Sequence, residues 1–210
     1  MIEKFIKDAL ILWATIDPIG TLAIFASLTA TLTPKERFKT AVKAITYSAI
    51  ILVGAVVIGQ ILLSAMGISL VSLQVAGGMI LFIFSLQMIF GDALAFSSGG
   101  EKEKGHDIAV FPLAVPSIAT PGAIMAAILL TDNHVYDIQT QVGTSLIMLG
   151  VLAVAFLFML AASPILKVIG QNGAAILIRV MGLILAAMSL EFILEAFKIF
   201  EWLETFNQTS

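Results

Sequence analysis

The sequence predicts an all-α membrane protein whose six transmembrane helices form two inverted three-helix repeats, a 3+3 arrangement. Composition is the first reason: 60% of the 210 residues are hydrophobic and 12% are charged, whereas soluble domains have about 45–50% apolar and about 25% charged residues. The second reason is that the apolar residues form runs long enough to cross a hydrocarbon core about 30 Å thick. The third is a set of prolines and glycines that recurs in the second half at a nearly constant spacing.

The first apolar run predicts a helix over residues 5–30 that is broken at Asp17-Pro18-Ile19-Gly20. Asp17 lies 12 residues after Phe5, about 18 Å along a helix and therefore near the middle of the bilayer. Proline removes a backbone donor, glycine loosens the chain, and a carboxylate at this depth is costly. Such backbone persists inside a membrane only where protein shields it or where it lines a watery cavity.

Two unbroken helices complete the first half. Thr33, Pro34 and Glu36 have the order of a capping box with proline at the first helical position. A turn at Met66-Gly67 separates the second and third helices, and a polar, Gly- and Ser-containing stretch then links the halves. We expect helices over residues 41–64 and 69–90, and a cytoplasmic linker over residues 92–107.

The second half repeats this plan. Its first apolar run is interrupted at Thr120-Pro121-Gly122, its second ends before Pro164, and a polar turn at residues 170–173 precedes its third. We expect the corresponding helices over residues 108–130, 142–162 and 174–197.

Matching residues indicate that the halves, residues 1–91 and 108–210, arose by duplication. Pro18 matches Pro121 and Gly67 matches Gly170, both at an offset of 103 residues. At one residue more, Ser85-Leu86-Gln87 matches Ser189-Leu190-Glu191. Because each half holds three spans, the second half must enter the membrane from the opposite side, as in many secondary carriers.

Basic residues predict the orientation, since cytoplasmic loops carry an excess of Lys and Arg. Seven lie on one side of the predicted bundle and three on the other. We therefore expect the first side in the cytoplasm, both termini outside it, and the protein in the cell (inner) membrane. The seven are Lys35, Arg37, Lys39, Lys43, Lys102, Lys104 and Lys167, and the three are Lys4, Lys7 and Lys198.

The two breaks are the candidate binding site. Their second half-helices are expected to begin near Gly20 and Gly122, where free N–H groups attract a carboxylate, while the carbonyl ends of the first halves attract a cation. Together they offer both poles that a small zwitterion needs. Asp17 would hold an ammonium group, carry a coupling proton, or cap the second half-helix as its N-cap. Hydroxyls nearby belong to Thr15, Thr21, Ser117 and Thr120.

Other candidates favour ordinary structural roles. Gln87 and Glu191 are weaker candidates, and Glu191 is expected near the outer interface, where its carboxylate reaches water. Gly77, Gly78 and Gly182 are expected to allow close helix packing. An intramembrane protease would need a second buried aspartate or a buried histidine, so we expect no enzyme. With no cysteine and two histidines in polar segments, we expect no metal site, and we expect no cofactor and no nucleic-acid partner.

Two segments, Asp17-Pro18-Ile19-Gly20 and Pro116-Ser117-Ile118-Ala119-Thr120-Pro121-Gly122-Ala123, together with the six-span layout, resemble the MarC family of bacterial and archaeal inner-membrane proteins. The resemblance covers essentially the whole chain. It implies a carrier: the family includes SnatA-type transporters that take up glycine and alanine, and it is distantly similar to LysE-type exporters. By this resemblance the substrate-binding residues are Asp17, Pro18, Ile19, Gly20, Thr21, Thr120, Pro121, Gly122 and Ala123, with Asp17 as the candidate for proton coupling.

Three hypotheses follow. The first is a proton-coupled secondary transporter of small neutral amino acids that works by alternating access. The second is an exporter of amino acids or another small solute with the same fold. The third is a membrane scaffold or sensor whose prolines only kink helices. The sequence leaves homo-oligomerisation open.

Overall fold

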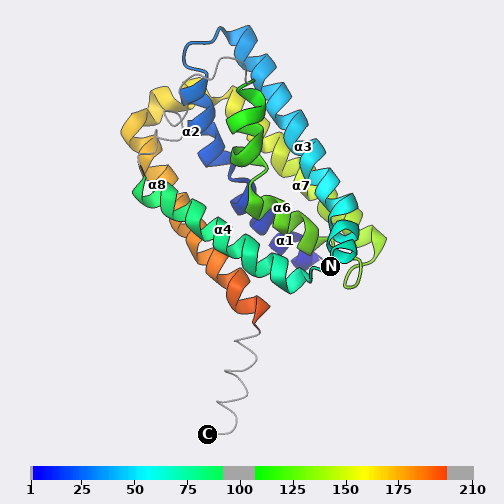
Figure 1. Ribbon diagram of the computed structural model, residues 1–210. Helices are drawn as coiled ribbons and strands as arrows, with labels where there is room; N and C mark the ends of the chain where they lie inside the picture. The colour runs from blue at the N-terminus through cyan, green and yellow to red at the C-terminus, as the bar shows by residue number, and fades with distance from the viewer. Residues whose placement is uncertain (1, 92–106, 198–210) are drawn as a thin grey trace, which may run out of the picture.

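The computed structural model describes residues 2–91 and 107–197, and within these ranges the chain is helical with no strands (Figure 1). Predictions for the linker at 92–106, which includes Lys102, Lys104 and His106, and for the tail after 197 lie outside the described residues. The helices are α1 (Ile2–Ile16), α2 (Pro18–Leu28), α3 (Pro34–Ala65), α4 (Leu70–Phe90), η1 (Ala109–Ile118), α6 (Pro121–Leu130), α7 (Ile138–Leu160) and α8 (Ala162–Ala196).

Five helical stretches in the described part of the chain are long and apolar enough to cross a membrane, counting α1 and α2 as one. η1 and α6 make a sixth if they form one span, and they meet at an angle of 55°. Large apolar side chains on the outer face of α3 are exposed, among them Val57 at 63% and Ile61 at 65%. Such a surface suits lipid rather than water, so the protein is a multi-pass helical membrane protein.

Besides α1, which begins at Ile2 rather than residue 5, three helices begin earlier than predicted. α3 begins at Pro34 rather than near residue 41, because the capping box is complete: Thr33 N donates to Glu36 Oε2 at 2.8 Å and Glu36 N to Thr33 Oγ1 at 3.4 Å. The basic segment after Pro34 is therefore helix and not loop. α7 begins at Ile138 rather than 142.

The third early start is α8, which includes a turn of helix before the predicted one. It begins at Ala162, so Pro164 lies in its first turn. Proline is tolerated there because the N–H groups of the first turn make no hydrogen bond within the helix. The predicted turn is confirmed at Gly170, whose φ of 66° lies in the left-handed region that glycine adopts freely.

α4 and α8 pack side by side along their length (Figure 1). A Cβ at Gly78 would lie 3.1 Å from the backbone O of Ser189, and one at Gly182 would lie 3.1 Å from the backbone O of Ser85. Gly77 lies against Met125 of α6. The expected packing role of these glycines is confirmed, and the contacts of Gly78 and Gly182 are reciprocal.

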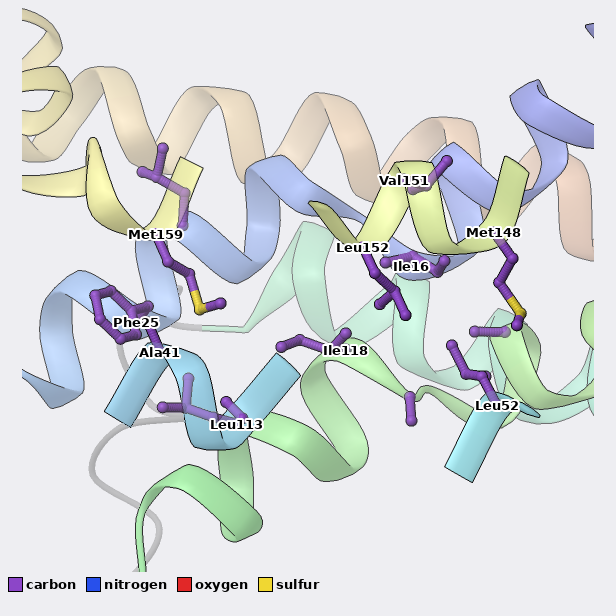
Figure 2. Close-up of a cluster of buried hydrophobic side chains, with 14 of the residues drawn as sticks. Ile16, Phe25, Ala41, Leu52, Leu113, Ile118, Met148, Val151, Leu152 and Met159 are labelled. Atoms are coloured by element: carbon purple, nitrogen blue, oxygen red, sulfur yellow. The ribbon is translucent and has the colours of Figure 1, made fainter. Parts of the chain in front are cut away.

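The larger core lies where α1, α2, α3, η1 and α7 meet (Figure 2). Its fully buried side chains include Ile16 of α1, Leu52 of α3, Ile118 of η1 and Leu152 of α7. Ile16 and Ile118 are the last helical residues before the two predicted breaks, so the chain changes direction inside the packed core.

The two short helices point in opposite directions along α3. Arg37 of α3 donates to the backbone O of Thr29 at 2.9 Å, just past the end of α2. Gln60 of α3 donates to the backbone O atoms of Ile128 and Thr131 at 3.4 Å each, at the end of α6. Arg37 and Gln60 are 23 residues apart, or about 35 Å of helix, so α2 and α6 end at opposite ends of α3.

Candidate binding site at the paired helix starts

Asp17 separates α1 from α2 and caps the second helix. Its backbone has φ 48° and ψ 70°, the left-handed conformation, and its side chain is 3% exposed. Oδ1 accepts a hydrogen bond from the backbone N of Gly20 at 3.0 Å. The predicted alternative of an N-cap is thus confirmed. A left-handed residue other than glycine costs roughly 1–2 kcal/mol.

Gly20 is required by this arrangement. A Cβ built on it would lie 2.0 Å from Asp17 Oδ2 and 2.9 Å from Asp17 Cγ, closer than any real contact. The carboxylate therefore lies directly over the first turn of α2, in the space that a side chain at residue 20 would fill.

Thr120 caps α6 at the equivalent position but in a different backbone state. Its φ of −65° and ψ of 156° are extended. Its hydroxyl accepts from Ala123 N at 2.9 Å and donates to the backbone O of Thr15 at 2.8 Å. Gly122 faces Leu81 of α4, whose Cδ1 would be 2.7 Å from an added Cβ.

The starts of α2 and α6 meet through hydroxyls of one interruption that bond to carbonyls of the other. Besides the Thr120–Thr15 bond, Thr21 Oγ1 donates to the backbone O of Ser117 at 3.5 Å. Because α2 and α6 end at opposite ends of α3, their positive N-terminal ends face the same region. That arrangement favours a negatively charged group between them.

A small cavity lies beside the start of α2. Its volume is about 20 Å³, room for about one water molecule. Ser117 Oγ of η1 is buried there without a hydrogen-bond partner among the described residues. The cavity is lined by Asp17, Gly20, Thr21, Ile24, Phe84, Met88, Ser117 and Ile178.

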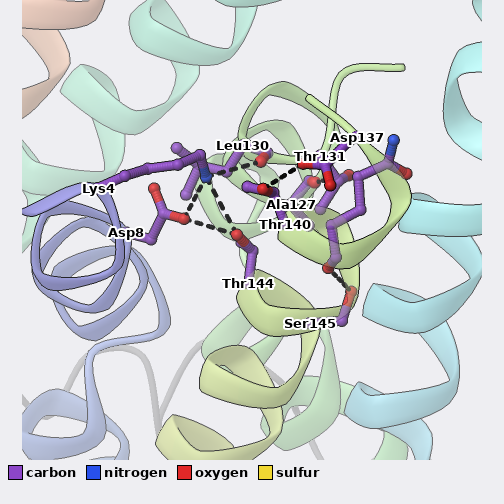
Figure 3. A network of polar contacts seen from close by, with 10 residues as sticks. Lys4, Asp8, Ala127, Leu130, Thr131, Asp137, Thr140, Thr144 and Ser145 are labelled. Atoms are coloured by element: carbon purple, nitrogen blue, oxygen red, sulfur yellow. Dashed lines mark hydrogen bonds and ion pairs between the residues drawn. The ribbon is translucent and has the colours of Figure 1, made fainter. Parts of the chain in front are cut away.

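A second polar cluster lies at the far end of α1 and was not predicted (Figure 3). Asp8 is 1% exposed; its Oδ2 lies 2.5 Å from Lys4 Nζ and accepts from Thr144 Oγ1 of α7 at 2.6 Å. Lys4 Nζ also donates to the backbone O of Leu130 at 3.4 Å and lies 4.0 Å from the centre of the Tyr136 ring. The cluster therefore joins α1, α7 and the end of α6.

Comparison with known proteins decides the family. A profile of the MarC family integral membrane proteins matches residues 2–200. The chain belongs to the MarC family. No solved structure matches it.

Relatives of this MarC protein are similar over nearly their whole length. UPF0056 membrane protein MJ1677 of Methanocaldococcus jannaschii is 32% identical over 94% of this chain and 97% of its own. A UPF0056 membrane protein of Archaeoglobus fulgidus is 34% identical over 88% of this chain and 87% of its own. UPF0056 inner membrane protein YhgN of Escherichia coli K12 is 29% identical over 94% and 98%. The predicted family is confirmed; these names carry no substrate.

Of the predicted site residues of this MarC protein, three line the cavity: Asp17, Gly20 and Thr21. Ile19 instead lines a separate apolar cavity of about 230 Å³ on another side of α2. Pro18 is buried at the first position of α2. The other four, Thr120, Pro121, Gly122 and Ala123, form the packed start of α6 and do not line the cavity. The short helices begin at Pro18 and Pro121, slightly before the predicted Gly20 and Gly122.

Sequence reasoning missed the apolar side of the cavity of this MarC protein. Phe84 and Met88 of α4 and Ile178 of α8 complete it, and one apolar residue in a span gives no signal that it faces a site. Gln87 and Glu191 are exposed and line no part of the cavity.

Proposed function

We propose that this MarC protein is a secondary transporter of small neutral amino acids of the glycine and alanine class, driven by protons and working by alternating access. The observation that carries the proposal is the meeting of two helix starts at a cavity with a buried carboxylate and an unpartnered hydroxyl. Helix N–H groups suit the carboxylate of an amino acid, and oxygen atoms suit its ammonium group. We propose no enzymatic reaction.

The lining of the cavity supports a substrate with an uncharged side chain. About 20 Å³ admits a water molecule but not an amino acid, so we propose that the cavity opens to load its substrate. The residues that line it apart from Asp17 carry no charge, which suits glycine and alanine.

An inverted repeat of residues 1–91 and 108–210 would provide the alternating movement. It is supported by the caps at Asp17 and Thr120, offset by 103 residues, and by the opposite directions of α2 and α6. The reciprocal Gly78–Ser189 and Gly182–Ser85 contacts agree with it. We propose that both interruptions lie near the bilayer midplane and that the alternating movement occurs around them.

Uptake of labelled glycine and alanine into proteoliposomes tests the function. We expect an inward proton gradient to drive accumulation in the wild-type protein. Gly150→Ala is a matched control, because an added Cβ there has no atom within 4 Å, and it should transport normally. Absence of glycine and alanine movement in both directions, in folded protein, would rule out this cargo; efflux alone from preloaded vesicles would indicate an exporter.

Orientation can be tested cleanly because the chain has no cysteine. Single cysteines at Lys35 and Asn133, both exposed, report the two sides. An impermeant maleimide applied to intact cells should label Asn133→Cys and leave Lys35→Cys unlabelled. The reverse pattern would place both termini in the cytoplasm.

A further inference from the structure

The start of α2 is already occupied by an anion, the carboxylate of Asp17. Its Oδ1 accepts from Gly20 N at 3.0 Å, while Thr21 N donates to the Asp17 backbone O at 3.0 Å. The space above Gly20 is filled by Oδ2, as the 2.0 Å approach to an added Cβ demonstrates. A second carboxylate can reach the Gly20 N–H only after the Asp17 side chain has moved away.

The start of α6 offers no comparable place. Ala123 N is bonded to Thr120 Oγ1 and Ile124 N to the Thr120 backbone O, each at 2.9 Å. The hydroxyl of Thr120 is held in turn by Thr15, and Leu81 covers Gly122. A carboxylate that enters the region therefore has the first turn of α2 as its available helix start.

Ser117 is an independent sign of a ligand at the same place. Its side chain is 6% exposed, and Oγ has no hydrogen-bond partner among the described residues. It lines the same cavity as Asp17 and Gly20. Leaving a buried hydroxyl unpaired costs about 1–3 kcal/mol, and its O–H is a donor that a carboxylate would accept.

Charge limits the region to one anion at a time. Asp17 is the one charged residue among those that line the cavity. The other residues that line it are uncharged: Gly20, Thr21 and Ile24 from α2, Phe84 and Met88 from α4, Ser117 from η1, and Ile178 from α8. Two carboxylates side by side without a cation would repel strongly, so one must lose its charge.

We infer that a substrate carboxylate replaces the Asp17 carboxylate at the Gly20 N–H and at Ser117 Oγ, and that Asp17 takes up one proton in the same step. The inference rests on the proposed function for the identity of the substrate. The exchange keeps one carboxylate anion in the site, that of Asp17 before it and that of the substrate after it. The proton on Asp17 and the substrate ammonium group leave the loaded site without net charge. Proton coupling then arises because the two anions exclude each other at one position.

Calorimetric titration of glycine into the purified protein, in buffers with different ionisation enthalpies, counts the protons. We expect about one proton taken up per glycine bound, and an affinity that falls about tenfold per pH unit above the point at which Asp17 ionises. Asp17→Asn should fold, because asparagine is a good N-cap and accepts the left-handed conformation. It should bind glycine with no proton uptake and no pH dependence.

Ser117→Ala tests the second contact. We expect roughly 10- to 150-fold weaker glycine binding, the value of one lost hydrogen bond to a charged group, with the proton count unchanged. Ser145→Ala is the matched control, because Ser145 Oγ bonds to the Gln141 backbone O away from the cavity. An unchanged affinity in Ser117→Ala would remove Ser117 from the site.

Two results would overturn the inference. The first is wild-type protein that binds glycine without taking up a proton. The second is a folded Asp17→Asn variant that binds no glycine, because Asp17 would then hold the ammonium group of the substrate. If wild-type protein binds no glycine, the proposed cargo fails and propionate, a carboxylate without an ammonium group, tests the site alone. Propionate that binds the wild-type protein more tightly at lower pH, but binds Asp17→Asn equally at every pH, would support one shared position for the two carboxylates. If propionate binds neither protein, the inference is rejected.

Discussion

The two interruptions, at Asp17 and Thr120, each precede a short helix but differ in backbone, charge and attachment. Asp17 is left-handed, and its side-chain hydrogen bond stays within its own helix. Thr120 is extended, and its hydroxyl bonds both to its own helix and to Thr15 across the interface. One cap holds strain and a charge, whereas the other is relaxed, neutral and tied to its neighbour.

This difference suggests a division of labour. A strained residue persists only where its surroundings hold it, and such residues gather at sites that change state. The Asp17 cap can therefore exchange its hydrogen bond, while the Thr120 cap keeps the two interruptions together.

The largest difference in stability between matched variants is expected where α2 and α6 end, far from the two interruptions. Lys4→Met should lower the free energy of unfolding by about 3–5 kcal/mol, because it leaves Asp8 buried and unpaired at the end of α6. Arg37→Met, at the end of α2, should cost about 1–2 kcal/mol, because Arg37 bonds to carbonyl and hydroxyl oxygens among the described residues. Unfolding in detergent measures both.

A double variant provides the control for that contrast. Lys4→Met combined with Asp8→Asn should recover most of the loss, since no uncompensated charge remains. A double variant as unstable as Lys4→Met alone would contradict the assignment of the effect to the buried charge.

The next effect separates the two glycines. Gly20→Ala should abolish uptake and cost about 2–3 kcal/mol, because the Cβ displaces the Asp17 carboxylate from its cap. Gly122→Ala should cost about 1 kcal/mol or less and retain uptake, because the group it meets is the flexible end of Leu81. Equal losses in the two variants would show that the starts of α2 and α6 are equivalent after all.

A smaller effect is expected at Thr120. Thr120→Val keeps the shape but removes the hydrogen bonds to Ala123 N and Thr15 O, at about 1–2 kcal/mol. Thr120→Ser retains the hydroxyl and should be close to wild type. Thermal unfolding distinguishes them, and in Thr120→Val the proton count per glycine should stay unchanged.

The smallest effect lies outside both interruptions, at the entry to η1. The ammonium of Lys43, 2.5 Å from Oδ2, holds the pKa of the Asp107 carboxyl below its usual range. Because the pKa of Asp107 is lower in the folded state, the ion pair stabilises the fold at pH values above the ordinary pKa of aspartate. This contribution is lost as the pH falls through the lowered pKa of the folded state. Asp107→Asn should cost less than about 1 kcal/mol at pH 7, since the pair is exposed, and nothing near pH 2; unfolding at the two pH values checks the sign.

Local chemistry explains what could be predicted. Proline is disfavoured inside a helix but suits its first position, so Pro18 and Pro121 mark the starts of α2 and α6 to within two residues of the prediction. At α3 two local patterns differ: the capping box at Thr33 predicts a helix from Pro34, whereas the apolar run predicts one from residue 41. The structure agrees with the capping box.

Contacts between distant segments explain what could not. The bond from Thr120 to Thr15 spans 105 residues of chain and the one from Thr144 to Asp8 spans 136. Neither bond follows from periodicity. The spacing of four residues between Lys4 and Asp8, at the start of the first apolar span, does indicate an ion pair on one face of a helix. The left-handed backbone of Asp17 likewise depends on packing around it.

The way the two short helices are capped bears on the order in which the chain inserts during synthesis. The end of α2 is bonded to Arg37, which follows it closely in the same half. The end of α6 is bonded to Gln60 and Lys4, both made long before it. The first half can therefore close its own cap as it leaves the ribosome, whereas α6 reaches the bilayer with its end uncapped and completes it on helices already inserted there. Translation from the N-terminus thus makes Gln60 and Lys4 before the carbonyl groups at the end of α6 to which they bond.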